Sequence, residues 1–81
     1  MSDWCVYMLR CADNSLYTGI TTDVKRRVNE HNATKSITKY TRTRQPVKLV
    51  YQEAVESRSI AGKREVALKK LRKEEKEAIL K

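Results

Sequence analysis

The chain has 81 residues, a length at which we expect one small domain spanning 1–81. Eighteen Lys and Arg residues against ten Asp and Glu give a net charge of +8, which favours a polyanionic partner such as nucleic acid. A basic surface that serves only solubility is the alternative. The N-terminus lacks the pattern of a signal peptide, and no segment approaches the ~20 apolar residues that span a membrane. We therefore expect a soluble cytoplasmic protein without a membrane partner.

The two cysteines lie on or beside the run WCVYMLRC, which has the pattern of a strand. Six residues of extended chain place Cys5 and Cys11 ~20 Å apart, whereas a disulfide requires α-carbons within about 7 Å. With one histidine in the chain, a zinc-type site is also not expected. We interpret both cysteines as small buried hydrophobic residues in a reducing compartment.

The first strand is expected over 4–10, with apolar residues on both faces, as in a central or well-covered strand. ADNS at 12–15 predicts a turn, and LYTGIT at 16–21 predicts a second, antiparallel strand. This hairpin would place Tyr7 and Tyr17 on neighbouring strands. Gly19 removes a side chain where a backbone or ligand could approach closely, or else it marks a bulge.

A helix is expected from Val24 to about Asn32, capped by the side-chain oxygen of Thr22 or Asp23. Residues 33–45 are rich in Thr, Lys and Arg without a clear period, which predicts a long basic loop.

The helix after this cap carries a cation on the face that should cover the sheet. At about 100° per residue, Val24, Val28, Arg27 and His31 share one arc. In one interpretation, Arg27 extends to water from the edge of the arc and His31 packs at the helix end. In the other, Arg27 has no acidic partner on its face and meets an external phosphate. Two such residues facing two tyrosines favour the phosphate.

The second half predicts one more strand and helical structure up to the C-terminus. VKLVYQEA at 47–54 alternates as a strand does. Ser57 is expected to cap a helix whose apolar positions are Ile60, Ala67, Leu68 and Leu71, and Glu65 falls at the margin of that arc. RKEEKEAILK is also helical, either as a continuation or as a separate helix. Its apolar residues 78–80 are expected to pack on the sheet rather than to dock a partner.

In combination, these motifs resemble the GIY-YIG nuclease domain family. The first name motif matches Cys5-Val6-Tyr7, the second matches Tyr17-Thr18-Gly19, and Arg27 and His31 follow at the family's spacing. The resemblance continues through KYTRTRQPVKLVY and LKKLRKEEKEAIL, so it covers nearly the whole chain. It implies the GIY-YIG fold: an α+β fold with a three-stranded antiparallel sheet flanked by helices, in the order strand, strand, helix, strand, helix, helix.

The resemblance also implies an activity and a cofactor. The family hydrolyses phosphodiester bonds with one divalent metal ion, Mg²⁺ or Mn²⁺, so the chain is expected to be an endonuclease acting on DNA, with RNA left open. By resemblance, Glu65 binds the metal, Arg27 holds the phosphate, and Tyr7 or Tyr17 assists in activating water. His31 and Tyr40 match further active-site positions. The chain departs from the family at Cys5, Thr18 and Arg72, and 33–39 lacks the usual glycines.

The segment between His31 and Gln52 contains no acidic residue. Its basic residues are candidates for binding nucleic acid: Lys35, Lys39, Arg42, Arg44 and Lys48. They motivate the alternative function, a nucleic-acid-binding module with weak or no nuclease activity. If about four of them meet duplex phosphates, log K should fall with log salt at a slope near −3.6. We expect a monomer or a weak homodimer.

Overall fold

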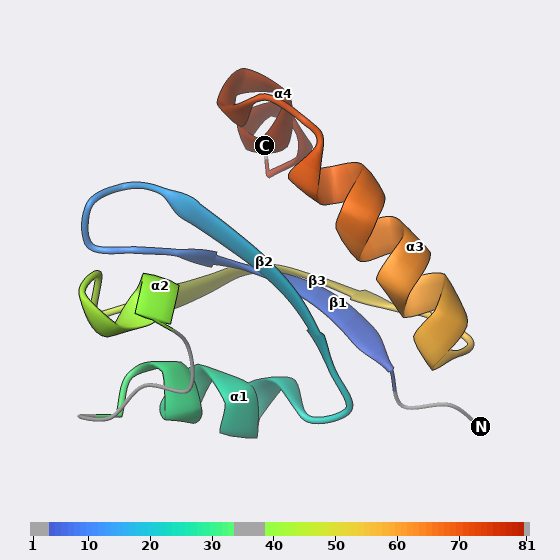
Figure 1. The fold of residues 1–81 in the computed structure, drawn as a ribbon, viewed down its shortest axis with the longest axis horizontal. Coiled ribbons are helices and arrows are strands. Elements are labelled where there is room, and N and C mark those ends of the chain that lie inside the picture. Colours follow the sequence, from blue (N-terminus) through green and yellow to red (C-terminus); the bar gives the residue numbers. More distant parts are fainter. Residues whose placement is uncertain (1–3, 34–38, 81) are drawn as a thin grey trace.

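Three antiparallel strands form one sheet in the computed structural model, which describes residues 4–33 and 39–80. The elements in chain order are β1 (Cys5–Arg10), β2 (Leu16–Thr21), α1 (Val24–His31), α2 (Lys39–Arg42), β3 (Lys48–Ala54), α3 (Arg58–Lys69) and α4 (Lys73–Ile79) (Figure 1). The strand order is β2-β1-β3. The expected α+β fold is confirmed, and α2 is the one element added to the expected order.

The N-terminal hairpin forms as the sequence predicts, with Tyr7 and Tyr17 on neighbouring strands. β1 pairs with β2 so that Tyr7 lies opposite Gly19 and Leu9 lies opposite Tyr17. Asn14 in the connecting turn adopts a positive φ of 70°, a conformation that Asn tolerates better than most residues. β1 also pairs with β3, so it is the central strand, and its residues 6–9 are at most 1 % exposed.

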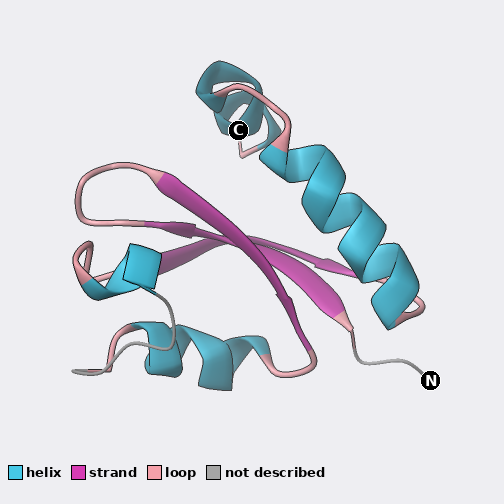
Figure 2. Cartoon of the chain, viewed as in Figure 1, coloured by secondary structure: helices cyan, strands magenta, loops and turns pink. Residues whose placement is uncertain are grey.

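Helices cover both faces of this sheet (Figures 1 and 2). The face toward α1 and α2 carries a core cluster of Tyr7, Leu9, Cys11 and Val47. The opposite face, toward α3, carries a second cluster in which Val6 packs with Ala61 and Leu68. Because β1 has a helical layer on each side, it is apolar at successive positions instead of alternating with polar ones.

Two side-chain caps set the starts of the longer helices, as expected. The carboxylate of Asp23 accepts a hydrogen bond from the Arg26 amide at 3.1 Å, and Ser57 Oγ accepts one from the Ile60 amide at 3.2 Å. Each cap satisfies a first-turn N–H that has no partner within its helix. Of the two candidates before α1, Asp23 is therefore the cap.

The basic loop expected over 33–45 contains the one-turn helix α2, so that prediction was wrong in part. Thr41 of α2 is fully buried, and the ring centroid of Tyr40 lies 5.6 Å from that of Tyr17. These contacts join segments that are distant in sequence. The sequence of 33–45 has no periodicity from which they could be predicted. The expectations for 34–38 lie outside the described residues.

The buried side of α3 lies one residue away from the side that the sequence predicted. Ile60 is 39 % exposed, whereas Ala61 and Leu68 are at most 1 % exposed. Measured from Ala61 at about 100° per residue, Glu65 lies at about 40° and Leu68 at about 340°. Glu65 thus belongs to the stripe that faces the sheet, and its expected marginal position was wrong.

The chain breaks after α3, so α4 is a separate helix. Its start is stabilised by Glu75, whose carboxylate accepts the Arg72 backbone N–H at 2.9 Å. α4 has no buried residue, Ala78 and Ile79 are exposed and Leu80 is half-buried, so the expected packing of residues 78–80 on the sheet was wrong. Instead, a two-bond ion pair joins Glu77 to Arg10 of β1.

Two expectations about composition can be compared with the described residues. Cys5 and Cys11 are free thiols, as expected, although Cys5 is half-buried and only Cys11 is buried. Within residues 4–33 and 39–80, no helix is long and apolar enough to cross a membrane.

Candidate active site

A buried chain of three side chains links the sheet to α1 and α2. The hydroxyl of Tyr7 lies 3.0 Å from His31 Nε2, and His31 Nδ1 lies 2.8 Å from Thr41 Oγ1. All three residues are at most 1 % exposed. The Tyr17 ring packs beside them, with its centroid 5.0 Å from that of His31. Through its contact with Tyr17, Tyr40 extends this aromatic cluster to α2.

Gly19 makes room for Tyr7 to cross the edge strand. A Cβ built at Gly19 would lie 2.6 Å from the Tyr7 hydroxyl oxygen and 2.7 Å from Cζ, closer than real Cβ contacts. The Tyr7 ring therefore lies directly against the β2 backbone. Because β2 is an edge strand, the Tyr7 hydroxyl reaches toward the edge of the sheet. Gly19 pairs with Tyr7 without a bulge, and the group that approaches it closely is the Tyr7 side chain rather than the backbone or ligand that was expected.

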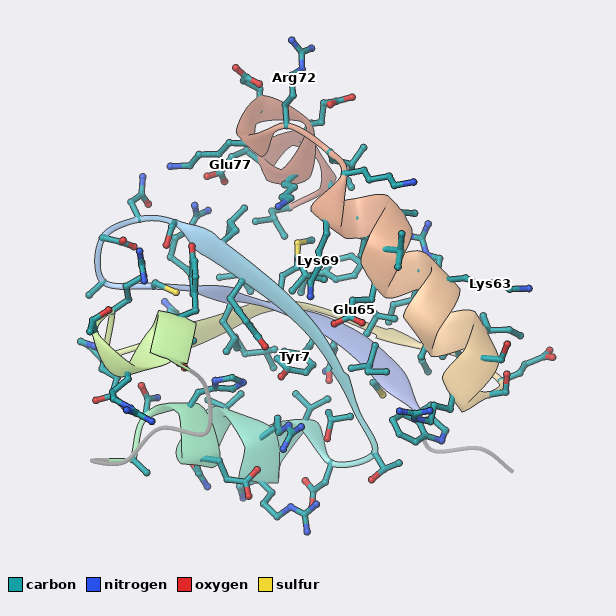
Figure 3. All side chains as sticks on the ribbon, in the orientation of Figure 1. Tyr7, Lys63, Glu65, Lys69, Arg72 and Glu77 are labelled. Carbon is teal, nitrogen blue, oxygen red and sulfur yellow. The ribbon has the colours of Figure 1, made fainter. Side chains whose placement is uncertain are left out.

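Arg27 from α1 and Glu65 from α3 both act on this hydroxyl. Figure 3 shows Glu65 directed from α3 toward the sheet and Tyr7. The pKa of Tyr7 is raised to about 12, chiefly by burial and also by the neighbouring Tyr17 and Glu65, while Arg27 opposes the rise. Three elements that are distant in sequence thus bring Tyr7, Arg27 and Glu65 together. At neutral pH the Tyr7 hydroxyl is protonated.

His31 is neutral in this environment. Burial lowers the pKa of His31, the nearby charge of Arg27 lowers it further, and Glu30 partly opposes them. A neutral imidazole has one donor and one acceptor nitrogen, which suits a position between two hydroxyl groups. The ring therefore connects Tyr7 to Thr41 without a buried positive charge.

The lowered pKa of His31 predicts a pH dependence of stability. Since the unfolded chain binds a proton near pH 6.5 and the folded chain resists it, the free energy of unfolding should fall as pH decreases below about 6.5, by at most about 1.4 kcal/mol per pH unit. Urea unfolding between pH 7.5 and about 5 measures this. His31→Gln should flatten the slope, because His31 is the single histidine in the chain. A slope that is identical in the variant would contradict the assignment.

Arg27 is half-buried, and its contacts differ from the expectation. Its Nη1 lies 3.4 Å from the carboxylate of Glu30, so Arg27 has an acidic partner although none was expected on its own face. Glu30 lies next to the predicted arc and reaches across one turn. However, Arg27 Nε is buried and has no hydrogen-bond partner within the described part of the chain. The guanidinium of Arg27 thus retains one donor that the described residues leave unsatisfied.

The carboxylate of Glu65 is paired with Lys69, whose Nζ lies 3.2 Å away. The Glu65 side chain is 23 % exposed, so it is accessible at the surface of the site. Lys69 was not among the predicted site residues, although its i,i+4 spacing from Glu65 could have revealed it. Thr41 was not predicted either, and the sequence carries no signal for it.

The protein would supply only part of the ligands that a divalent metal needs at this site. Among residues 4–33 and 39–80, no group of three or more His, Cys, Asp or Glu side chains is arranged to hold a metal ion. Mg²⁺ is commonly held by one or two carboxylates together with water and substrate phosphate. The single carboxylate of Glu65, near Tyr7 and the unsatisfied donor of Arg27, has the chemistry of such a site.

The basic residues that were predicted to bind nucleic acid do not share one environment in the structure. Arg42 and Lys48 are exposed, Lys35 lies outside the described residues, and the side chain of Lys39 is not described. Arg44 is engaged within the fold, where it pairs with Asp13 at 2.9 Å. It also donates to the Tyr40 carbonyl and lies 4.1 Å from the centroid of that ring. Arg44 therefore joins the hairpin turn to α2, which was not expected.

Comparison with known proteins places these elements in a family. The model of the GIY-YIG catalytic domain matches residues 3–78. The sequence is 50% identical over 78 residues to a UPF0213 protein of Desulfotalea psychrophila, covering 96% of this chain and 71% of that protein. It is 52% identical over 79 residues to one of Listeria monocytogenes, covering 98% and 87%.

Solved structures show the same similarity. The solution NMR structure of a UPF0213 protein from Bacillus halodurans has a TM-score of 0.61 and 43% identity, covering 95% of this chain and 81% of that one. A protein from E. faecalis has a TM-score of 0.59 and 41% identity, covering 93% and 80%. The family match includes the elements that carry Tyr7, Arg27 and Glu65. The chain therefore belongs to the GIY-YIG family, a nuclease superfamily.

Proposed function

We propose that the protein is a divalent-metal-dependent endonuclease that hydrolyses phosphodiester bonds of DNA, with Mg²⁺ or Mn²⁺ as its cofactor. The observation that carries this proposal is the buried Nε of Arg27, which has no partner among the described residues and lies in the site with Tyr7 and Glu65. Membership of a nuclease superfamily supports a nucleic-acid substrate.

Arg27 holds the scissile phosphate. Its planar guanidinium can donate two parallel hydrogen bonds to phosphate oxygens, and its charge persists at any working pH. Negative charge that develops on the phosphoryl oxygens is stabilised by a donor already fixed on α1, so little reorganisation is needed. Other electrostatic clamps of this kind contribute about 3 to 4 kcal/mol to the transition state.

Tyr7 assists in activating the attacking water. With a pKa of about 12 it is a poor base alone, but its hydroxyl touches His31 Nε2 at 3.0 Å. If Nε2 is the acceptor nitrogen, Tyr7 can pass its proton to His31 while it accepts one from water, so no free tyrosinate is required. Tyr17 covers the pair with its ring. Its role is to exclude bulk water from this transfer.

Glu65 is the residue that would hold the metal ion. When bound, a divalent ion supplies Lewis-acid stabilisation of the leaving oxygen and lowers the pKa of coordinated water. In the structure, the carboxylate of Glu65 forms an ion pair with Lys69 instead. Because Lys69 is half exposed, it can leave Glu65 without disturbing the core.

Cleavage of a substrate panel tests this function. Single-stranded, duplex, flap and junction DNA, with RNA counterparts, are incubated with purified protein in Mg²⁺, Mn²⁺ or EDTA. We expect cleavage of DNA with either metal and none in EDTA. Salt-dependent binding without cleavage of any substrate would contradict the endonuclease and support the alternative, a nucleic-acid-binding module that uses exposed cations such as Arg42 and Lys48.

A further inference from the structure

A basic pocket adjoins the proposed active site. It lies at the corner where β2 ends and where α1 and α3 begin (Figure 1). Its volume is about 240 Å³, and its lining includes Trp4, Thr21, Arg26, Arg27 and Arg58. Arg27 also lies in the proposed active site with Tyr7 and Glu65. A ligand in this pocket would therefore lie next to the phosphate that Arg27 holds.

Two of the three arginines that line this pocket, Arg26 and Arg58, have no acidic partner among the described residues, whereas Arg27 has its long contact with Glu30. Neither Arg26 nor Arg58 forms an ion pair with any residue in 4–33 or 39–80, and both are exposed. The neighbouring carboxylate of Asp23 is engaged as the cap of α1. Guanidinium groups gathered around one pocket repel each other until an anion enters. The pocket therefore favours phosphate groups.

Trp4 adds an aromatic surface to this positive pocket. It is half-buried and packs on the core cluster of Val6, Ala61 and Leu68, which holds the indole in place. The guanidinium carbon of Arg58 lies 5.8 Å from its ring centroid. An indole with an arginine beside it is the combination on which unpaired bases stack. A base within an intact duplex has both faces covered by its neighbours and cannot use such a surface.

We propose that the Trp4 pocket binds one unpaired nucleotide next to the phosphate that is cut. The base stacks on Trp4 beside Arg58. The phosphate of this nucleotide that faces Arg27 is the one bound in the proposed active site. Arg26 contacts the adjoining backbone. The position of the cut rests on the proposed function, whereas the binding itself does not. The substrate class is then nucleic acid with a single-stranded segment, such as a flap or a frayed end.

Trp4 reports directly on this binding, because it is the single tryptophan of the chain. The full chain is titrated in EDTA, without cleavage, with oligothymidylate, with an abasic deoxyribose-phosphate oligomer of equal length, and with a DNA duplex. We expect quenching of Trp4 fluorescence by oligothymidylate and binding about tenfold weaker for the abasic oligomer, as loss of one stacked base predicts. The duplex should not quench Trp4.

Three variants test the residues, with affinity measured by anisotropy of a labelled oligothymidylate. Arg58→Gln should weaken binding several-fold, whereas Lys63→Gln, the same change of charge at an exposed position directed away from the sheet on the same helix, should change it less than about twofold (Figure 3). Trp4→Leu keeps an apolar side chain against the core and should remove the preference for oligothymidylate over the abasic oligomer. Because Arg58 is exposed, its variant tests the proposal even if Trp4→Leu unfolds.

Two results would overturn the pocket: equal affinity of the wild type for normal and abasic oligomers, or equal effects of the Arg58 and Lys63 variants. These failures are distinct from failure of the proposed function. Quenching of Trp4 without cleavage under any metal condition refutes the endonuclease and leaves the pocket standing. Cleavage that is indifferent to Trp4→Leu and Arg58→Gln refutes the pocket alone.

Discussion

Arg27→Gln is expected to lower the rate of DNA cleavage by about 10²- to 10³-fold, the effect of removing one fixed donor from a charge-stabilising site. The substitution keeps a polar side chain of similar length but removes the charge and the fork of donors. Arg27 is half-buried with an unsatisfied Nε and a long 3.4 Å contact to Glu30. Its loss should therefore cost little folding free energy. Single-turnover cleavage with Mg²⁺, together with thermal unfolding, measures both quantities.

Lys25→Gln is the matched control for this variant. Lys25 is exposed on the same helix, and the substitution removes the same charge. We expect it to retain cleavage within a few-fold of the wild type. Arg27→Lys should be intermediate, since the ammonium keeps the charge without the planar geometry. Equal cleavage by the Arg27 and Lys25 variants would show that Arg27 does not hold the phosphate.

Gly19→Ala is expected to destabilise the protein by about 1 to 3 kcal/mol and to impair cleavage as well. The added methyl group would meet the Tyr7 hydroxyl and ring at 2.6 and 2.7 Å. One side must move, and Tyr7 is fixed in the core, so the 3.0 Å contact with His31 should be lost. Urea unfolding measures the free energy, and the chemical shifts of the His31 ring report on the contact.

Substitution of the second glycine, Gly62, is expected to have the opposite effect on stability. Gly62 lies within α3, and a Cβ there would have nothing within 4 Å. Gly62→Ala should stabilise the protein by about 0.5 to 1 kcal/mol, because alanine loses less backbone entropy in a helix. The two identical substitutions should thus have opposite signs. A Gly19→Ala protein as stable as the wild type would contradict the packing of Tyr7 against β2.

The features that local periodicity determines could be predicted from the sequence. The hairpin followed from two strand-like runs on either side of a turn cluster, so Tyr7 and Tyr17 were correctly placed on neighbouring strands. The projection of α1 correctly placed His31 on the inner face, where it is fully buried. Such patterns work where one face of a regular element is strongly apolar.

The remaining features depend on contacts between distant segments. α3 has few apolar residues, and two of them, Ile60 and Val66, are exposed. The buried side of the helix was therefore predicted from Ile60, which faces solvent, and Glu65 was placed at the wrong position relative to the sheet. Thr41 and Arg44 lie in a segment without periodicity, and their roles arise from His31 and Asp13 elsewhere in the chain. Only the assembled fold brings these partners together.

The most direct test of the proposed activity is Mg²⁺-dependent DNA cleavage by the wild type and by Glu65→Gln, purified identically. Glu74→Gln serves as the control, because Glu74 is an exposed carboxylate on α4. If Glu65 holds the metal, the wild type and Glu74→Gln cleave and Glu65→Gln does not, while all three unfold at similar temperatures. Equal cleavage by Glu65→Gln and the wild type would contradict the proposal, because the metal would then be held elsewhere or the activity would belong to a contaminant.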